Sequence, residues 1–285
     1  MEETGEHIKA CIERALDEDA ARNDVTTALA VAPVQMGRAF IKAREAGVVS
    51  GQRVAEAVFR ALDGEVSYET AVRDGERAEA DCVVTRLEGR LRAILAGERT
   101  ALNFLGRLCG IATLTARYVG NVAGSGVVIL DTRKTTPGLR ILEKEAVRHG
   151  GGRNHRIDLQ ERILVKENHI TAAGGMIPLL ERIGPERLQK AEIEVSCLAE
   201  LGMLQGSPPA MVMLDNFTPD MIRSAVAELE QWDSPRPEIE VSGGITLETV
   251  ASFAIPGVDY ISIGSLTASA AALDLSLIVD EVWEP

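Results

Sequence analysis

The stretch DTRKTTPGLRILEKEAVRHGGGRNHRIDLQERILVKENHI, residues 131–170, sets the organisation of the chain. It joins two apolar segments, VVILD (127–131) and ILVK (163–166), that are typical of buried strands. The formal net charge of the whole chain is −13, yet this stretch is rich in lysine and arginine. Cations that gather against the overall sign of a protein indicate a local site for an anion. They are Arg133, Lys134, Arg140, Lys144, Arg148, Arg153, Arg156, Arg162 and Lys166.

One pattern recurs through the rest of the chain. A short apolar segment is followed each time by a segment that is helical or marked by glycine. The six apolar segments are VVILD (127–131), ILVK (163–166), EIEVS (192–196), MVML (211–214), EIEVS (238–242) and YISI (260–263). This alternation predicts parallel strands joined by crossover helices. A barrel of such units places every strand exit, and therefore every polar side chain that follows a strand, at one mouth.

The first part of the chain has a different character. Helical periodicity over residues 4–20 and 52–62 is mixed with strand-like segments over residues 36–51, 65–72 and 82–89, which indicates an α+β domain. A long helical region follows from Gly89 to about Asn121, and its internal glycines predict two or three helices instead of one. We therefore expect an N-terminal α+β domain over 1–115, a βα barrel with the active site over 116–270, and a C-terminal helix over 271–285 that packs back on the N-terminal domain.

Composition excludes several classes of protein. No apolar run reaches the roughly 18 residues of a membrane span, and the acidic amino terminus lacks the order of a signal peptide, so we expect a cytoplasmic protein. A pI near 4.9 argues against nucleic acid as a partner. The four cysteines are far apart in the sequence, which predicts reduced thiols and no structural zinc.

The predicted strand exits carry the candidate site. Arg133, Lys134 and Lys166 supply positive charge, and Glu194 and Asp215 supply negative charge, either as counter-ions or to act on a developing positive charge or a metal. Any Mg²⁺ is expected to be held mainly by substrate phosphates. The last two exits are glycine turns that expose N–H groups and open helices, a typical phosphate site. They contain Ser242, Gly243, Gly244, Ile263, Gly264 and Ser265.

Four further charged residues have open roles at this point. Glu192 lies on the same strand face as Glu194 and acts either as a second anion or as one partner of a buried pair. Arg99 either pairs with Glu98 at a helix surface or reaches a ligand. Lys144 and Arg148 are interpreted as the solvated face of a charged helix.

The sequence resembles the quinolinate phosphoribosyltransferase family of NAD biosynthesis. The resemblance covers residues 97–267, with weaker similarity in the N-terminal domain, and rests on GERTALNFLGRLCGIAT, LDTRKTTPGLRILEKEAVRHGGGRNHR, LVKENHI, MLDNF, VSGGIT and GVDYISIGSLT. It implies an α/β fold, a partly open βα barrel of about six or seven parallel strands, with an N-terminal α+β domain. It also implies a homodimer in which Arg99 reaches into the site of the neighbouring subunit.

The implied reaction joins two anionic small molecules. The ring nitrogen of quinolinate attacks C1 of 5-phosphoribosyl 1-pyrophosphate (PRPP), pyrophosphate leaves, and the 2-carboxylate is lost as CO₂ to give nicotinate mononucleotide. The family motifs assign quinolinate binding to Arg99, Thr132, Arg133, His155, Arg156 and Lys166.

The resemblance assigns the chemistry of the ribose to other residues. Lys134 neutralises the departing pyrophosphate, whereas Glu194 and Asp215 stabilise the oxocarbenium-like ribose and contact Mg²⁺ or ribose hydroxyls. Ser242 to Gly244 and Ile263 to Ser265 match the cradle of the 5′-phosphate. Mg²⁺ is expected with the pyrophosphate substrate, and no organic cofactor is expected.

Two departures from the family pattern concern the identity of the substrate. Asp158 stands where the family usually has a small residue, so it either weakens dianion binding or orients Arg156, and Ala268 replaces a histidine. Two rival readings remain: a related phosphoribosyltransferase that acts on another base, and a non-catalytic barrel that senses a phosphorylated metabolite. The cationic set is excessive for a neutral base, and sensing alone needs no anions near the ribose.

Overall fold

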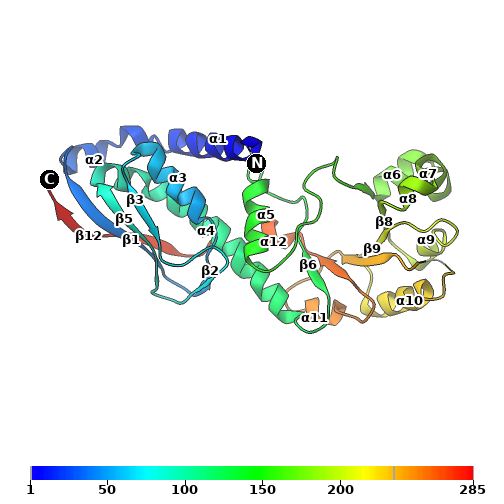
Figure 1. Cartoon of the computed structure of the whole chain (residues 1–285). Helices are drawn as coiled ribbons and strands as arrows, with labels where there is room; N and C mark the ends of the chain where they lie inside the picture. The colour runs from blue at the N-terminus through cyan, green and yellow to red at the C-terminus, as the bar shows by residue number, and fades with distance from the viewer. Residues whose placement is uncertain (1, 234, 285) are drawn as a thin grey trace. The chain divides into compact units, whose positions relative to one another are not determined.

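The computed structural model describes residues 2–233 and 235–284, which fold as two compact units (Figure 1). The first unit combines Met1–Ala116, Thr135–Gly151 and Leu266–Pro285, and the second combines Arg117–Lys134 and Gly152–Ser265. No helix within the described ranges has both the length and the apolar character needed to cross a bilayer.

The first unit is built on an antiparallel sheet of four strands in the order β12-β1-β5-β3. Their bounds are Leu275–Trp283, Met36–Ala43, Val83–Arg90 and Ser67–Thr70, and a separate pair joins β2 (Gly47–Val48) to β4 (Arg77–Ala78). The helices are α1 (Glu2–Glu18), α2 (Val25–Ala30), α3 (Gln52–Leu62), α4 (Leu91–Asn121) and α5 (Arg140–His149), with a 3₁₀ turn at Ala21–Asn23.

Helix α4 is a single helix of 31 residues, so the prediction of two or three segments was wrong. Gly97, Gly106 and Gly110 of this helix are points of close approach within the first unit. A Cβ on Gly97 would lie 2.8 Å from the ring of Phe59, and a Cβ on Gly106 would lie 3.1 Å from the carbonyl oxygen of Leu273. The helix therefore accepts the low helix propensity of glycine because neighbouring segments pack directly against its backbone.

The closest of these approaches gives a stability prediction. A Cβ on Gly110 would overlap the carbonyl oxygen of Ala271, which is backbone and has little room to move. We expect Gly110→Ala to lower the free energy of unfolding by about 1–3 kcal/mol, the usual cost of overpacking. Gly120 lies on the same helix, and an added methyl group there would meet nothing within 4 Å, so Gly120→Ala should instead stabilise by up to about 1 kcal/mol. Urea unfolding of both variants measures the difference, and equal effects would contradict this packing account.

The C-terminal segment is a strand, and the prediction of a helix over 271–285 was wrong. Strand β12 pairs antiparallel with β1 from Met36↔Trp283 to Ala43↔Leu275, and Figure 1 shows the red end of the chain beside the blue strand β1. A short apolar run such as LSLIV fits a helix or a strand equally well. Strand β1 lies far earlier in the sequence. Its edge supplies the hydrogen-bond partners that make residues 275–283 a strand.

Helix α5 belongs to the first unit, although we expected residues 116–270 to form one domain. Glu143 on α5 has no exposed surface and forms an ion pair with Arg107 on α4, with Nη2 and Oε1 separated by 2.9 Å. The same guanidinium donates to the carbonyl oxygens of Thr267 and Ala270. On α5, Arg148 is exposed as predicted, but Lys144 is buried, so its interpretation as a solvated cation was wrong.

The second unit contains a parallel sheet of six strands, which confirms the predicted fold class. The order is β6-β11-β10-β9-β8-β7, the sequence of neighbours in a barrel that is opened between its first two strands. The bounds are β6 Val128–Leu130, β7 Ile163–Val165, β8 Ala191–Val195, β9 Met211–Asp215, β10 Glu238–Ser242 and β11 Tyr260–Ser262. The connecting helices are α6 (Glu167–Ala173), α7 (Met176–Ile183), α8 (Pro185–Leu188), α9 (Leu198–Gly202), α10 (Pro219–Leu229) and α11 (Val250–Phe253). Helix α12 (Ser265–Ala268) begins at the last residue of this unit, and its other residues belong to the first.

A short segment around Arg153 lies beside β6 at the open edge of this sheet. The backbone N–H of Arg153 donates to the carbonyl oxygen of Ile129 at 2.9 Å. The backbone N–H of Asp131 donates to the carbonyl oxygen of Arg153 at 3.1 Å. The bridge between Leu130 and Arg153 is parallel, like the rest of the sheet. Arg153 thus occupies the place of a seventh strand beside β6, and residues 154–156 come directly after it.

Candidate functional site

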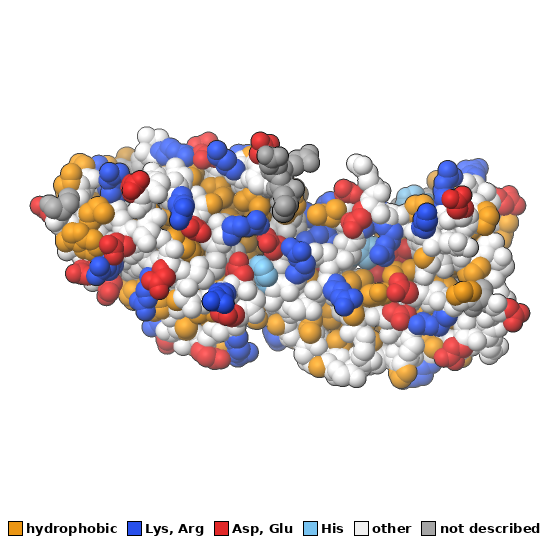
Figure 2. Space-filling model, in the orientation of Figure 1, with side chains coloured by type: hydrophobic (Ala, Val, Ile, Leu, Met, Phe, Trp, Pro, Cys, Tyr) orange, Lys and Arg blue, Asp and Glu red, His pale blue; other side chains and the backbone are white. Residues whose placement is uncertain are grey.

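With the exception of Arg99, every residue predicted for the site lies in the second unit. Each one lies at the end of a strand, in the loop that follows, or, for Ser265, at the start of a helix, so the parallel direction of the strands brings them to one edge. Positive and negative side chains are otherwise mixed over the face drawn in Figure 2.

Two strand-end carboxylates lie among lysines. Lys166, directly after β7, donates from Nζ to Oε2 of Glu194 on β8. Burial, and then the negative charge of Glu194, raises the pKa of Asp215 at the end of β9, while Lys166 and Lys134 act in the opposite direction. The four charges are thus close enough to influence one another. Glu194 does have a counter-ion, which was one of its two expected roles.

The turn after β10 requires glycine at two positions. Gly243 and Gly244 have φ of 97° and 62°, a region that side chains with a Cβ rarely adopt. A Cβ on Gly243 would also lie 2.8 Å from the backbone nitrogen of Asn216. Asn216 has a φ of 58° and donates from Nδ2 to Asp215 at 2.6 Å. The glycine turn and Asp215 are therefore joined through Asn216, a residue that sequence reasoning missed.

The turn after β11 packs against Lys134. A Cβ on Gly264 would lie 2.8 Å from Cδ of Lys134, so the absence of a side chain at this position leaves room for the lysine side chain. Helix α12 begins at Ser265, as expected of a turn that opens a helix. The turn after β10 does not follow that expectation, because α11 begins only at Val250. If the N–H groups of Gly243 and Gly244 bind an anion, the turn itself presents them, because no helix begins there.

Two arginines carry buried N–H groups for which the described part of the chain offers no hydrogen-bond partner. Neither Nε of Arg133 nor Nε of Arg156 has a hydrogen-bond partner among the residues that the structure describes. Burial, and then the nearby positive charge of Arg133, lowers the pKa of Arg156. A buried donor without a partner is costly, and two cations that repel each other add to that cost. An anion with planar oxygens bound between them would remove both penalties.

The loop that carries these cations is fixed by short-range contacts. Oγ1 of Thr132 accepts a hydrogen bond from the backbone N–H of Lys134 at 3.1 Å and so shapes the turn after β6. Nη1 of Arg156 donates to the carbonyl oxygen of Arg162 at 3.0 Å. The carboxylate of Asp158 accepts hydrogen bonds from the backbone N–H groups of Gln160 and Glu161 and so stabilises the turn in which it lies.

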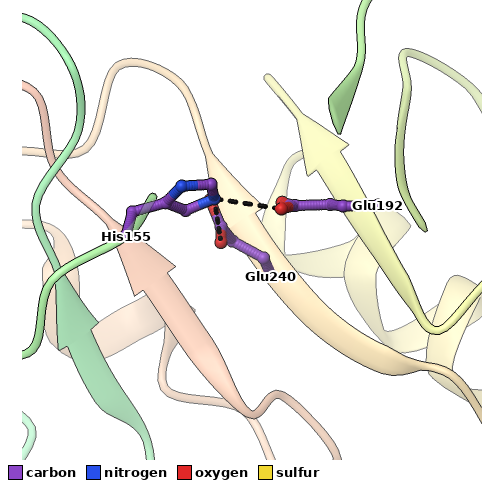
Figure 3. Close-up of side chains that lie close together, drawn as sticks. All are labelled: His155, Glu192 and Glu240. Carbon is purple, nitrogen blue, oxygen red and sulfur yellow. Dashed lines mark hydrogen bonds and ion pairs between the residues drawn. The ribbon is translucent and has the colours of Figure 1, made fainter. Parts of the chain in front are cut away.

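The ring of His155 is buried between two glutamates from different strands (Figure 3). Its Nε2 lies 3.0 Å from Oε2 of Glu192 on β8 and 3.4 Å from Oε2 of Glu240 on β10, and neither glutamate is exposed. Burial alone would lower the pKa of His155, but the two neighbouring carboxylates, Glu192 and then Glu240, act in the opposite direction and raise it. Glu192 is therefore part of a buried cluster, one of the two roles that the sequence left open.

Sequence reasoning missed Glu240, although a signal was present. The string EIEVS occurs twice, over 192–196 and 238–242, and both copies form strands of the same sheet. Glu192 is aligned through Met211 with Glu238 and not with Glu240. The two glutamates that meet at His155 are offset by two residues, as expected when strands are tilted around a barrel.

Arg99 is the one predicted site residue outside the second unit. It lies on α4 in the first unit and its side chain is exposed. Burial raises the pKa of its neighbour Glu98, and the positive charge of Arg99 opposes that rise. An exposed guanidinium on a helix remains available to a ligand or to another subunit.

Two family models match the chain. The model described as the N-terminal domain of quinolinate phosphoribosyl transferase matches residues 24–109, and the model of its C-terminal domain matches residues 111–278. Together they account for most of the sequence.

Similar proteins and structures point the same way. A carboxylating nicotinate-nucleotide pyrophosphorylase of Mycobacterium leprae is 38% identical, covering 93% of this chain and 95% of the relative. A decarboxylating quinolinate phosphoribosyltransferase of Nicotiana tabacum is 37% identical, and the match covers 96% of this chain and 82% of the relative. The structure of the nicotinate-nucleotide pyrophosphorylase from Francisella tularensis superposes with a TM-score of 0.87 at 36% identity, covering 96% of each chain.

Proposed function

The chain belongs to the quinolinate phosphoribosyltransferase family, and we propose that the strand-end face of its second unit joins quinolinate to PRPP. The products are nicotinate mononucleotide, pyrophosphate and CO₂. The observation that carries this proposal is the pair of buried Nε–H groups on Arg133 and Arg156 that have no partner within the described residues. Quinolinate carries two carboxylates, and the arginine fork matches a carboxylate through two parallel bonds.

We assign the remaining quinolinate contacts to Thr132 and Lys166, with His155 next to Arg156 in the same loop. Lys166 already bonds Glu194, which holds its ammonium group at the strand end. Thr132 shapes the turn that presents Arg133 and Lys134. The site thus combines two guanidinium groups with an ammonium group, enough positive charge for a dianion.

The chemistry begins when the lone pair of the ring nitrogen forms a bond to C1 of PRPP. The bond from C1 to the pyrophosphate oxygen breaks, and Lys134 neutralises the negative charge that leaves. The ribose passes through an oxocarbenium-like state, which the carboxylates of Glu194 and Asp215 stabilise. The ring nitrogen is then cationic, so it accepts the electrons of the 2-carboxylate bond as CO₂ departs, and a proton from solvent replaces the lost carboxylate.

The 5′-phosphate of the ribose is assigned to the two glycine turns. Ser242, Gly243 and Gly244 present the first set of backbone N–H groups, and Ile263, Gly264 and Ser265 present the second. The positive φ values of Gly243 and Gly244 support this assignment, because such turns direct N–H groups to one side and form anion-binding concavities.

Glu194 and Asp215 are also the residues that would hold Mg²⁺. Two adjacent carboxylates suit a hard cation that prefers oxygen ligands, and the way Glu194 raises the pKa of Asp215 supports their closeness. When bound, the ion supplies positive charge to the pyrophosphate group.

We further propose that the protein is a homodimer in which Arg99 completes the quinolinate site of the neighbouring subunit. Its exposure on α4 supports this role, because an exposed guanidinium can reach another chain. Loss of quinolinate turnover in Arg99→Ala, restored by mixing with a variant that lacks Arg133 instead, would identify a shared site.

The decisive assay uses the intact protein with Mg²⁺, PRPP and quinolinate. We expect release of CO₂ and pyrophosphate and formation of nicotinate mononucleotide in equal amounts. Nicotinate replaces quinolinate in the control, and we expect no product from it, since it lacks the carboxylate at position 2. Turnover of nicotinate alone would contradict the assignment, and PRPP binding without pyrophosphate release would support the sensor reading instead.

A further inference from the structure

Both ring nitrogens of His155 are already engaged by the protein. Nε2 faces the two glutamates (Figure 3), and Nδ1 lies 2.7 Å from the backbone nitrogen of Arg156, whose N–H it accepts. A ring that accepts at Nδ1 is the neutral tautomer with its proton on Nε2. In this tautomer the Nε2 hydrogen is directed at Glu192 and Glu240.

The cluster has the residue types of a metal site, but its surroundings argue against one. The nearest ligand atoms of His155, Glu192 and Glu240 all lie within 4.8 Å of one another. A histidine that binds a metal through Nε2 carries its proton on Nδ1 and donates it to an acceptor. Here the neighbour of Nδ1 is a donor, the N–H of Arg156. In addition, the guanidinium of Arg162 lies 3.5 Å from Oε2 of Glu192 and would repel a cation.

We propose that Glu192 and Glu240 are positioning residues that hold the ring of His155, so that His155 acts on quinolinate through Arg156 and not as a direct donor. This inference rests on the proposed function. Arg156 is tied to the ring through its backbone and carries one of the two partnerless Nε–H groups. A shift of the ring therefore moves the guanidinium that binds the substrate carboxylate.

A third carboxylate holds the same segment from another strand. Asp131, directly after β6, accepts the backbone N–H of His155 at 2.8 Å and Nδ2 of Asn154 at 2.6 Å, and it has no exposed surface. Residues 154–156 are thus fixed by side chains from β8, β10 and the end of β6. Such fixation matters because a displacement of about 1 Å in a substrate-binding group costs up to about a hundredfold in rate.

The kinetic test compares Glu192→Gln, Glu240→Gln and the double variant with wild type. Glutamine keeps the size of the side chain, so the fold should survive. We expect the double variant to raise the KM for quinolinate about tenfold, with the KM for PRPP and kcat changed less than twofold. Glu238→Gln is the matched control, because Glu238 lies two residues from Glu240 on the same strand but is exposed. An unchanged KM for quinolinate, or equal changes in both KM values, would overturn the proposal.

Combining these changes with His155→Gln separates the two modes of action. If His155 acts through the glutamates and Arg156, its removal from the double variant adds little to the KM for quinolinate, since coupled residues are not additive. If His155 bonds quinolinate directly, the losses multiply and the proposal fails.

Nitrogen-15 NMR of histidine-labelled protein gives a readout that does not need turnover. We expect Nε2 of His155 to be protonated and its signal to stay in place when quinolinate is added, but to move in Glu240→Gln. A signal that follows quinolinate would overturn the proposal, as would a stoichiometric divalent metal found by elemental analysis of the purified protein. If wild type forms no nicotinate mononucleotide, the proposed function fails, while these spectra still decide which partners His155 has.

Discussion

Arg133→Ala is expected to raise the KM for quinolinate by on the order of a hundredfold while changing the KM for PRPP only slightly. Charge-assisted hydrogen bonds contribute roughly 1.5–3 kcal/mol each, and a guanidinium fork makes two of them to one carboxylate. Because about 1.4 kcal/mol corresponds to a factor of ten, the loss of both bonds accounts for the expected effect. The Nε–H of Arg133 is buried without a partner among the described residues, so we expect a bound carboxylate to satisfy it.

Initial rates measured over a range of each substrate provide the two KM values. Arg133→Lys keeps the charge but loses the fork, so its effect on quinolinate should be intermediate. Arg148→Ala is the control from the same basic stretch, since Arg148 is exposed on α5, and it should leave both KM values unchanged. Equal changes in both KM values for Arg133→Ala would contradict its role as a quinolinate ligand.

Gly243→Ala is expected to lower kcat/KM for PRPP by about a hundredfold or more. The φ of 97° is unfavourable for alanine, and the new Cβ would lie 2.8 Å from the backbone nitrogen of Asn216. Since backbone cannot move aside as a flexible side chain does, the turn and Asn216 must separate. Asn216 donates to Asp215, so one methyl group would disturb both the proposed phosphate-binding turn and a carboxylate that we assign to the ribose.

Two other glycines make the test specific. Gly244 also has a positive φ but has nothing within 4 Å of a Cβ, so Gly244→Ala should show only the smaller cost of the backbone conformation. Gly206 lies in the same unit with open space around it, and Gly206→Ala should leave kcat/KM unchanged. Binding of PRPP measured by calorimetry gives a second readout. If Gly243→Ala and Gly244→Ala lose the same activity, the contact with Asn216 is not what matters.

The sequence errors share one physical cause. Gly110 was interpreted as a helix break, but it lies against the backbone of Ala271, a contact that no local pattern reveals. The segment LSLIV was interpreted as helix, but the edge of β1 makes it a strand. Lys144 was placed on a solvated face, but it is buried. In each case a partner far away in the chain overrides the local propensity.

The sequence by itself determined the family and the alternation of strands and helices, and it predicted an anionic ligand. Strand exits carry Arg133, Lys134 and Lys166, and parallel strands bring their exits to one edge whatever the details of packing. Only the tertiary structure decided that His155 lies between Glu192 and Glu240, and that Asn216 joins Gly243 to Asp215. The reason is that these partners meet through strand tilt and sheet register, which depend on hydrogen bonds between strands that are distant in the sequence.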